Sequence, residues 1–155
     1  MSDRHSRLII VPHNVAFGLM YGGIDVVVVH HAGPEGLAGQ RILGAIIIVA
    51  GAALATWVLI YLRSWRFRAT LDAGHELATG GPFRLVRHPI SPALDLLAIG
   101  TAVWAPTSML LAAAALMVIG SEVRGQAEEK LLLSAIGDRY RTYTAKTARF
   151  VPGLY

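Results

Sequence analysis

Cysteine is absent from the 155-residue sequence, and charged residues make up only 15% of it. The absence of cysteine excludes a disulfide framework, a thiolate zinc site and a cysteine nucleophile. A soluble globular domain averages about 25% charged residues, whereas hydrophobic residues make up 54% of this chain. No 20–50-residue repeat occurs, which argues against a solenoid. The composition therefore indicates one membrane domain, residues 1–155, rather than a soluble, disordered or repetitive protein.

Four apolar segments account for this composition. Residues 42–62 carry no charge, and a membrane-spanning helix needs about 20 such residues. Residues 8–29 are mainly apolar, and residues 90–105 and 109–119 form two shorter runs separated by Pro-Thr-Ser. The last run is long enough to span only if its helix continues past Gly120. We expect an all-α polytopic membrane protein with about four transmembrane helices, a C-terminal helical hairpin and a cytoplasmic C-terminal segment.

The Lys and Arg side chains predict an orientation. Thirteen of the fourteen fall on one side of the expected spans, and Arg41, in the loop after the first span, is the exception. The positive-inside rule makes the populated side cytoplasmic, with both termini inside, in a membrane such as the bacterial inner membrane. The net charge of +4 then reflects topology and gives no evidence for nucleic-acid binding. Gly18, Gly22 and Gly51 permit close helix contact, either within one chain or in a homo-oligomer.

The first of two dense polar segments, residues 79–89, leads directly into the third span. Pro89 suits the first turn of a helix, so Arg87 and His88 are predicted to lie at a helix N-terminus. The unpaired N–H groups there suit an anionic ligand group. The alternative is that Arg84 and Arg87 are interfacial anchors and that His88 only caps the helix.

The second polar segment follows the fourth span. If the helix continues, Glu122 and Glu129 share one face by their i, i+7 spacing, and Arg124 and Glu128 form an i, i+4 pair on another. Gly137 is a natural residue to end this helix. Carboxylates just outside the bilayer suit a cationic ligand, or one with amine and hydroxyl donors. The alternative is a solvated helix extension stabilised by ion pairs.

Other polar residues are weaker candidates. His13 and Asp25 lie within the first span, where an ionisable residue is a functional-site candidate. Asp95 lies one turn into the third helix and could face the same cytoplasmic site. A hydrolase built from Ser91, His88 and Asp95 lacks the Gly-x-Ser-x-Gly turn. No metal site is expected, because ligand spacing is missing around the remaining candidate histidines: His30, His31 and His75.

Two stretches of the sequence resemble a known family. Residues 81–89, GPFRLVRHP, are similar to the G-P-[YF]-R-x-V-R-H-P stretch of the isoprenylcysteine carboxyl methyltransferases, which are related to the phospholipid methyltransferases. Downstream, the Glu128-Glu129 pair, two tyrosines and a closing Arg-Phe-Val-Pro are similar too. The resemblance covers residues 79–152 as a methyltransferase-like core, and the two N-terminal spans in residues 1–62 resemble the family only as membrane helices.

The resemblance implies an integral membrane methyltransferase that uses S-adenosylmethionine on the cytoplasmic side. Its acceptor would be a small lipophilic or lipid-like molecule that arrives from the bilayer. Arg87 and Glu129 would be the catalytic residues nearest the reaction. The cofactor-binding residues that the resemblance implies are Arg87, His88, Pro89, Glu128, Glu129, Tyr140 and Lys146.

One departure from the family pattern bears on the substrate. Ser91 stands where the family usually has a tyrosine, and the chain is short for the family, which argues against a prenylated protein as acceptor. Two alternatives remain open: a non-catalytic membrane scaffold or partner protein of the same fold, and an NADPH-dependent steroid-reductase-like enzyme. The second would use Arg63, Arg66 and Arg68 for phosphates, although the Glu128-Glu129 pair would repel them.

Overall fold

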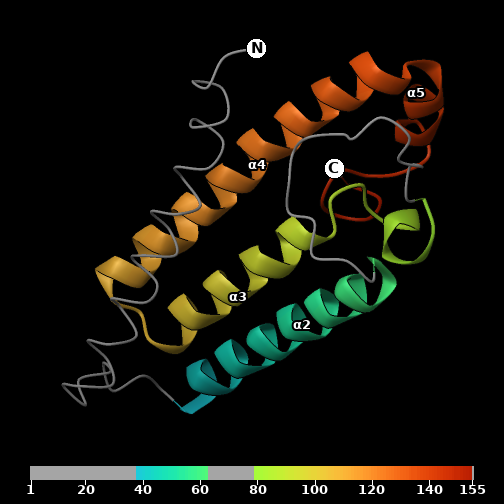
Figure 1. Ribbon diagram of the computed structural model, residues 1–155. Coiled ribbons are helices and arrows are strands. Elements are labelled where there is room, and N and C mark those ends of the chain that lie inside the picture. The colour runs from blue at the N-terminus through green and yellow to red at the C-terminus, as the bar shows by residue number, and fades with distance from the viewer. Residues whose placement is uncertain (1–37, 63–78, 155) are drawn as a thin grey trace.

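The computed structural model describes residues 38–62 and 79–154, and within these ranges the chain is all-helical. The expected all-α class is therefore confirmed for the described residues, while the predicted span at residues 8–29 lies outside them. Figure 1 shows three long helices side by side, with the middle one antiparallel to its neighbours. The elements in chain order are α2 (Ala38–Leu62), η1 (Gly81–Arg84), α3 (Ile90–Trp104), α4 (Ser108–Ile136) and α5 (Asp138–Thr144).

Two of these helices, α2 and α4, are long and apolar enough to cross a membrane, and α3 is a shorter apolar helix. The outer face of α2 is strongly apolar: Val49 and Ile60 are each about two-thirds exposed, at 66% and 68%. The helix begins at Ala38, so Arg41 lies in its first turns rather than in a loop as expected. In the first turn of the helix, the side-chain amide of Gln40 donates to the carbonyl of Val103 at 2.7 Å.

Helices α3 and α4 form the predicted hairpin. Thr107 begins α4, because its side chain accepts a hydrogen bond from the Leu110 N–H at 3.2 Å. No proline interrupts the helix, which continues past Gly120 for another four turns. Gly137 ends it with φ of 49°, a backbone conformation that glycine adopts without a steric cost. Both the continuation and the glycine stop agree with the sequence.

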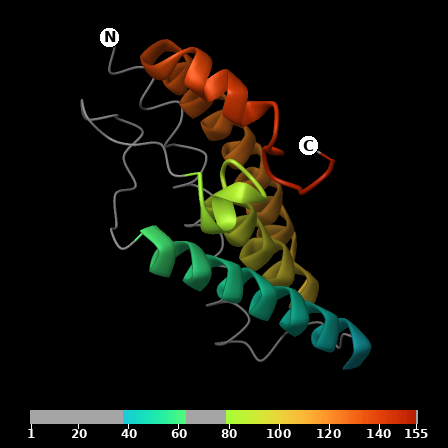
Figure 2. The ribbon, with the colours of Figure 1, turned by 90° about the vertical axis from the view of Figure 1, so that its right-hand side faces the viewer.

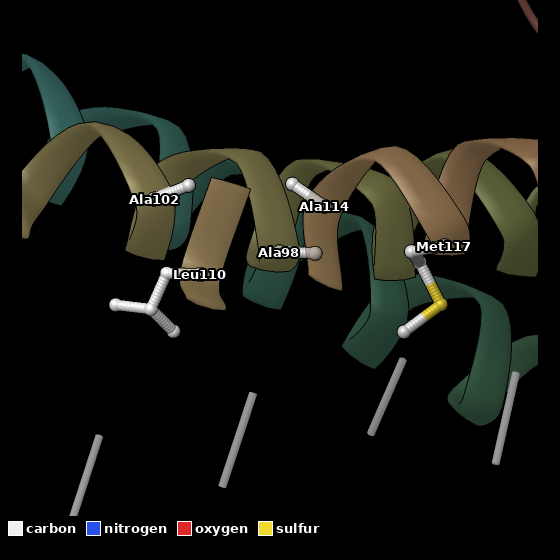
Figure 3. Packing of buried hydrophobic residues seen from close by; sticks show 5 residues of the cluster. All are labelled: Ala98, Ala102, Leu110, Ala114 and Met117. Carbon is white, nitrogen blue, oxygen red and sulfur yellow. The ribbon is translucent and has the colours of Figure 1, made fainter. Parts of the chain in front are cut away.

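The core lies between the two arms of this hairpin. The buried cluster combines alanines of α3 with Leu110, Ala114 and Met117 of α4 (Figure 3). Small side chains on one helix let the other approach closely, and this is how membrane helices gain packing energy. The buried residues of this core are Ala98, Ala102, Leu110, Ala114 and Met117.

Gly51 brings α2 equally close to α3. A Cβ atom at this position would lie 2.9 Å from the carbonyl oxygen of Ala93 and 3.0 Å from Cβ of Leu96. Those distances leave no room for a larger residue. The close contact expected of Gly51 therefore occurs within this chain, whereas Gly18 and Gly22 lie outside the described residues.

The basic side chains concentrate at one end of the bundle. In Figures 1 and 2, η1, α5 and the C-terminal segment meet at the end where α2 finishes and α3 begins. Arg41 belongs to the opposite end, in the first turns of α2. The described cationic residues at or near the crowded end are Arg84, Arg87, Arg124, Lys130, Arg139, Arg141, Lys146 and Arg149.

Candidate functional site

The C-terminal segment, residues 145–154, returns from α5 to run beside the residues between η1 and α3 (Figure 2). Val86 and Ala148 form a parallel bridge. The Arg87 N–H donates to the carbonyl of Ala148 at 2.8 Å, and the His88 N–H donates to the carbonyl of Arg149 at 3.2 Å. These backbone bonds bring the side chains of Arg87, His88 and Arg149 to the polar end of α4.

Arg87 joins three parts of the chain. Its Nε donates to Oε1 of Glu129 at 3.0 Å, and its Nη1 donates to the carbonyls of Thr144, at 3.2 Å, and Thr147. The side chain is only 13% exposed, so it does not anchor in lipid headgroups as the alternative interpretation held. Arg84, by contrast, is exposed, which is compatible with the expected role of an interfacial anchor.

His88 faces both carboxylates of the predicted pair. Its Nδ1 lies 3.2 Å from Oε2 of Glu128, and its Nε2 lies 3.4 Å from Oε1 of Glu129. The second contact lacks hydrogen-bond geometry, so the buried Nε2 has no hydrogen-bond partner among the described residues. Pro89, not His88, stands at the N-cap of α3, and no side chain caps that helix. The interpretation of His88 as a helix cap is therefore wrong.

The serine–histidine–aspartate alternative also fails on geometry. Asp95 accepts a hydrogen bond from Ser121 at 2.8 Å, whereas the carboxylates beside His88 belong to the glutamates of α4. Ser91 is buried in the first turn of α3. Asp95 therefore does not join the charged cluster that the sequence placed it near.

Arg149 is the residue of this site that sequence reasoning did not assign. Its Nη1 donates to Oε1 of Glu122 at 2.7 Å, while Nε and Nη2 donate to the two oxygens of Glu129 at 2.9 and 2.8 Å. Two signals pointed toward it: the closing Arg-Phe-Val-Pro of the family resemblance, which contains Arg149, and the shared face of Glu122 and Glu129, two like charges that a nearby cation stabilises. The sequence did not show which cation supplies it.

Glu128 and Glu129 lie at the polar end of α4, beyond its apolar part. Glu128 forms an ion pair with Arg124, and Glu129 forms ion pairs with Arg87 and Arg149. Arg124 donates to Glu128 at 2.7 Å, which confirms the predicted i, i+4 pair. Burial opposes ionisation of Glu129, but hydrogen bonds from Arg149 and Arg87 outweigh it and hold its pKa below the ordinary value. For Glu128, burial is likewise outweighed by the His88 hydrogen bond and the Arg124 charge, so its pKa is lowered. Both side chains are therefore carboxylates at neutral pH.

Tyr140 lies beneath this charged cluster and is 1% exposed. Burial, with the negative charge of Glu129, raises the pKa of its phenol above the ordinary value. The hydroxyl therefore stays protonated, yet it has no hydrogen-bond partner among the described residues. The neighbouring Tyr143, by contrast, donates to the carbonyl of Phe83 at 2.7 Å. Tyr140 thus offers an unused donor.

Lys146 is the predicted site residue that the structure does not bring into the cluster. It follows α5 on an exposed turn, and none of the ion pairs within residues 38–62 and 79–154 includes it. The charged cluster thus contains equal numbers of arginines and glutamates around one histidine. Its members are Arg87, His88, Glu122, Arg124, Glu128, Glu129 and Arg149.

The cluster combines two chemistries in one partly buried place. Its guanidinium groups recognise carboxylates, and its carboxylates accept hydrogen bonds from amines and hydroxyls. Within the part of the chain that the structure describes, no group of three or more His, Cys, Asp or Glu residues could hold a metal ion. The predicted His13, Asp25, His30, His31 and His75, and Arg63, Arg66 and Arg68 of the reductase alternative, lie outside the described residues.

Two apolar helices of membrane-spanning length, with a partly buried cluster of opposite charges at the polar end of α4, are the features of a helical membrane protein. The chain belongs to the phospholipid methyltransferase family, whose family model matches residues 39–139. The matched region runs from α2 into α5 and stops before Lys146 and Arg149. A search of curated proteins finds no match. Family membership implies methyltransferase activity in general and association with a membrane.

Proposed function

We propose that this protein is an integral membrane methyltransferase that transfers a methyl group from S-adenosylmethionine to a small lipophilic or lipid-like acceptor. The observation that carries the proposal is the charged cluster at the start of α3 and the polar end of α4. In a chain of the phospholipid methyltransferase family, such a cluster would let the polar groups of a cofactor meet the end of the apolar helices, which supports the proposal.

The side chains present fit the proposed cofactor. It carries a carboxylate, an amine and ribose hydroxyls together with a positively charged sulfur. Arg87 and His88 would receive the carboxylate, and Glu128 and Glu129 would accept hydrogen bonds from the amine or the ribose. Two buried atoms without a hydrogen-bond partner in the described chain, the Tyr140 hydroxyl and His88 Nε2, add free hydrogen-bonding capacity.

When bound, S-adenosylmethionine supplies a methyl group on a sulfonium. Transfer of that group is an in-line displacement, which depends on aligning the reacting atoms at about 3–3.5 Å more than on acid–base chemistry. The residues of this chain would therefore act by holding the cofactor and orienting the acceptor toward its methyl group. We propose Arg87 and Glu129 as the catalytic residues nearest the reaction, and their mutual hydrogen bond at 3.0 Å inside the charged cluster supports this assignment.

The remaining assignments are supported by position. Pro89 sets the backbone that presents Arg87 and His88, and it is buried at the N-cap of α3. Lys146 is proposed to attract a cofactor or acceptor carboxylate as a point charge from the exposed turn after α5. The excess of cations at this end supports a cytoplasmic location of the site, in a membrane such as the bacterial inner membrane with both termini cytoplasmic.

Radiolabel transfer tests this function. The purified chain in detergent is incubated with total membrane lipids and S-adenosylmethionine labelled in the methyl group, and label is counted in the organic extract. We expect label with the wild type and background counts with Arg87→Gln. Background counts with a folded wild type contradict the proposal and favour the non-catalytic scaffold.

A further inference from the structure

The C-terminal segment carries a hydrogen-bonded turn with exposed apolar side chains at both of its ends. Pro152 and Gly153 occupy the two central positions, and the φ of 75° at Gly153 is the conformation that a type II turn requires at its third residue. The Leu154 N–H closes the turn by donating to the carbonyl of Val151 at 3.1 Å. Val151 is nevertheless 47% exposed, and Leu154 is 83% exposed. Residues 151–154, named the apolar turn here, therefore present two apolar side chains from a defined backbone.

The apolar turn follows directly on residues of the candidate site. Arg149 donates to Glu122 and Glu129. The ring of Phe150 lies 5.8 Å from the ring of His88, measured between centroids. Whatever covers the apolar turn therefore bears on how firmly Arg149 and Phe150 are held in place.

The lengths of the helices set the level of the apolar turn relative to a bilayer. Gln40 bonds to Val103, so the start of α2 and the end of α3 lie at the same level. From that level α2 extends for 25 residues, about 37 Å, whereas α3 has only 15 residues, about 22 Å. A hydrocarbon core of about 30 Å that begins there ends beyond the start of α3. The C-terminal segment lies beside the start of α3, so its apolar turn is near the edge of the core (Figure 2).

The outward side of α4 leads to the same level. Arg149 is bonded to Glu122, and the side chains one turn before Glu122, Val118 and Ile119, are exposed apolar residues of the spanning helix. On η1, which precedes the stretch paired with the C-terminal segment, Arg84 is exposed, and arginine suits the headgroup level. The apolar turn thus continues a lipid-facing surface at the depth where apolar and basic side chains meet the bilayer.

We propose that the apolar turn inserts Val151 and Leu154 into the bilayer, at the boundary between acyl chains and headgroups, and that this lipid contact holds Arg149 and Phe150 in the candidate site. The occupant is a lipid surface, because the turn continues the lipid-facing side of α4 at the edge of the core. The inference goes beyond the proposed function and does not depend on which reaction the charged cluster supports.

Spin-label accessibility tests the insertion. The sequence contains no cysteine, so Leu154→Cys places a single nitroxide label on the full chain, which is reconstituted in vesicles of phosphatidylcholine and phosphatidylglycerol. We expect oxygen, which concentrates in lipid, to relax this label more than a water-soluble nickel chelate does. Asp138→Cys is the aqueous control, because that side chain is 97% exposed. Val49→Cys, on the outer face of α2, is the lipid control.

The other outcomes overturn the insertion. A Leu154 label that responds like the Asp138 label shows that the turn lies in water. A label shielded from both reagents shows that protein covers it, and line broadening that disappears on dilution with unlabelled chain identifies that protein as a second copy. Should Leu154→Cys fail to fold, Val151→Cys carries the label with the same expectation.

Hydrogen exchange tests whether the lipid contact holds the segment. The N–H groups of Arg87 and His88 donate to carbonyls of the C-terminal segment, so their exchange rates report its release. In nanodiscs of the same lipids, we expect Leu154→Asp to raise both rates several-fold, because a carboxylate opposes insertion, and the apolar control Leu154→Ile to leave them unchanged. Unchanged rates in a folded Leu154→Asp overturn the inference. Neither measurement involves turnover, so a failure here leaves the proposed function standing.

Discussion

Arg149 holds Glu129 with two hydrogen bonds, from Nε to Oε1 at 2.9 Å and from Nη2 to Oε2 at 2.8 Å. This fork fixes the C-terminal segment to α4, and Arg87 shares the same carboxylate from the start of α3. Three parts of the chain that are far apart in sequence therefore meet at one side chain. The candidate site depends on all three, because α4 supplies its carboxylates while Arg87 and Arg149 come from the start of α3 and the C-terminal segment.

Replacing Arg149 with Lys should loosen the C-terminal segment. Lysine keeps the charge but lacks the planar fork that matches a carboxylate, so the two-bond contact with Glu129 is lost. We expect faster hydrogen exchange at residues 145–152 and about tenfold weaker S-adenosylmethionine binding. Arg141→Lys is the control, since that side chain is 76% exposed. Equal exchange rates in both variants would argue against the role of the fork.

Glu129→Gln and His88→Ala should each weaken cofactor binding without unfolding the protein. Each removes one polar partner assigned to the cofactor, and a hydrogen bond to a charged group corresponds to tenfold or more in affinity. Calorimetry measures the affinity, and circular dichroism checks the helices. Wild-type affinity in both variants would remove the charged cluster as the cofactor site.

The substitution Tyr140→Phe tests the role of the Tyr140 hydroxyl, because it removes only that group. The hydroxyl has no hydrogen-bond partner in the described chain, so its removal should leave the melting temperature unchanged or slightly higher. The proposed role as a cofactor donor nevertheless predicts weaker cofactor binding. A variant that is equally stable and binds equally well assigns Tyr140 to packing alone.

Gly125→Ala should narrow the space between α4 and the C-terminal segment. The added Cβ would lie 2.8 Å from the Phe150 ring, so Phe150 must move, at a cost of about 1–3 kcal/mol of folding free energy. Gly39→Ala is the matched control, because nothing lies within 4 Å of its added Cβ. We expect thermal unfolding to show Gly125→Ala less stable and the control unchanged or more stable. An equal loss of stability in the two variants would show that the contact between residue 125 and the Phe150 ring does not cause the destabilisation.

The lowered pKa values of Glu128 and Glu129 predict sensitivity to acid. Both lie below the ordinary value of 4.5 in the folded protein. A depressed folded-state pKa stabilises the fold above the unfolded pKa, and this stability is lost as pH falls through the folded-state pKa. The melting temperature should therefore be nearly constant from neutral pH to about pH 5 and should fall steeply below about pH 5. Glu129→Gln should show a shallower fall, and an identical profile would contradict the account.

Local patterns predicted the helices well. The uncharged run at residues 42–62, the Pro-Thr-Ser turn and Gly137 correspond to α2, the hairpin turn and the end of α4, because each rule depends on neighbouring residues. The hydrogen bond from Gln40 in the first turn of α2 to Val103, 63 residues away, was not predicted. Such a contact leaves no local signal.

The site was predicted only in part, because contacts between residues far apart in the sequence leave no local signal. Arg87, His88 and the glutamate pair were found from motif spacing, and the structure brings them together. The pairings across the fold were not predicted, although Arg149 belongs to the closing motif: Arg149 bonds to two carboxylates because the C-terminal segment returns to α4, and Asp95 bonds to Ser121 on the opposite helix. Helix periodicity places side chains on faces, but it does not say which faces meet.

Calorimetric titration of the detergent-purified wild type with S-adenosylmethionine and S-adenosylhomocysteine, with NADPH as control, tests the central claim most directly. The account predicts saturable micromolar binding of the first two and none of NADPH, with both affinities reduced in Glu129→Gln. Absence of binding in a folded sample would contradict it and favour a membrane scaffold, and binding of NADPH alone would point to the reductase-like alternative.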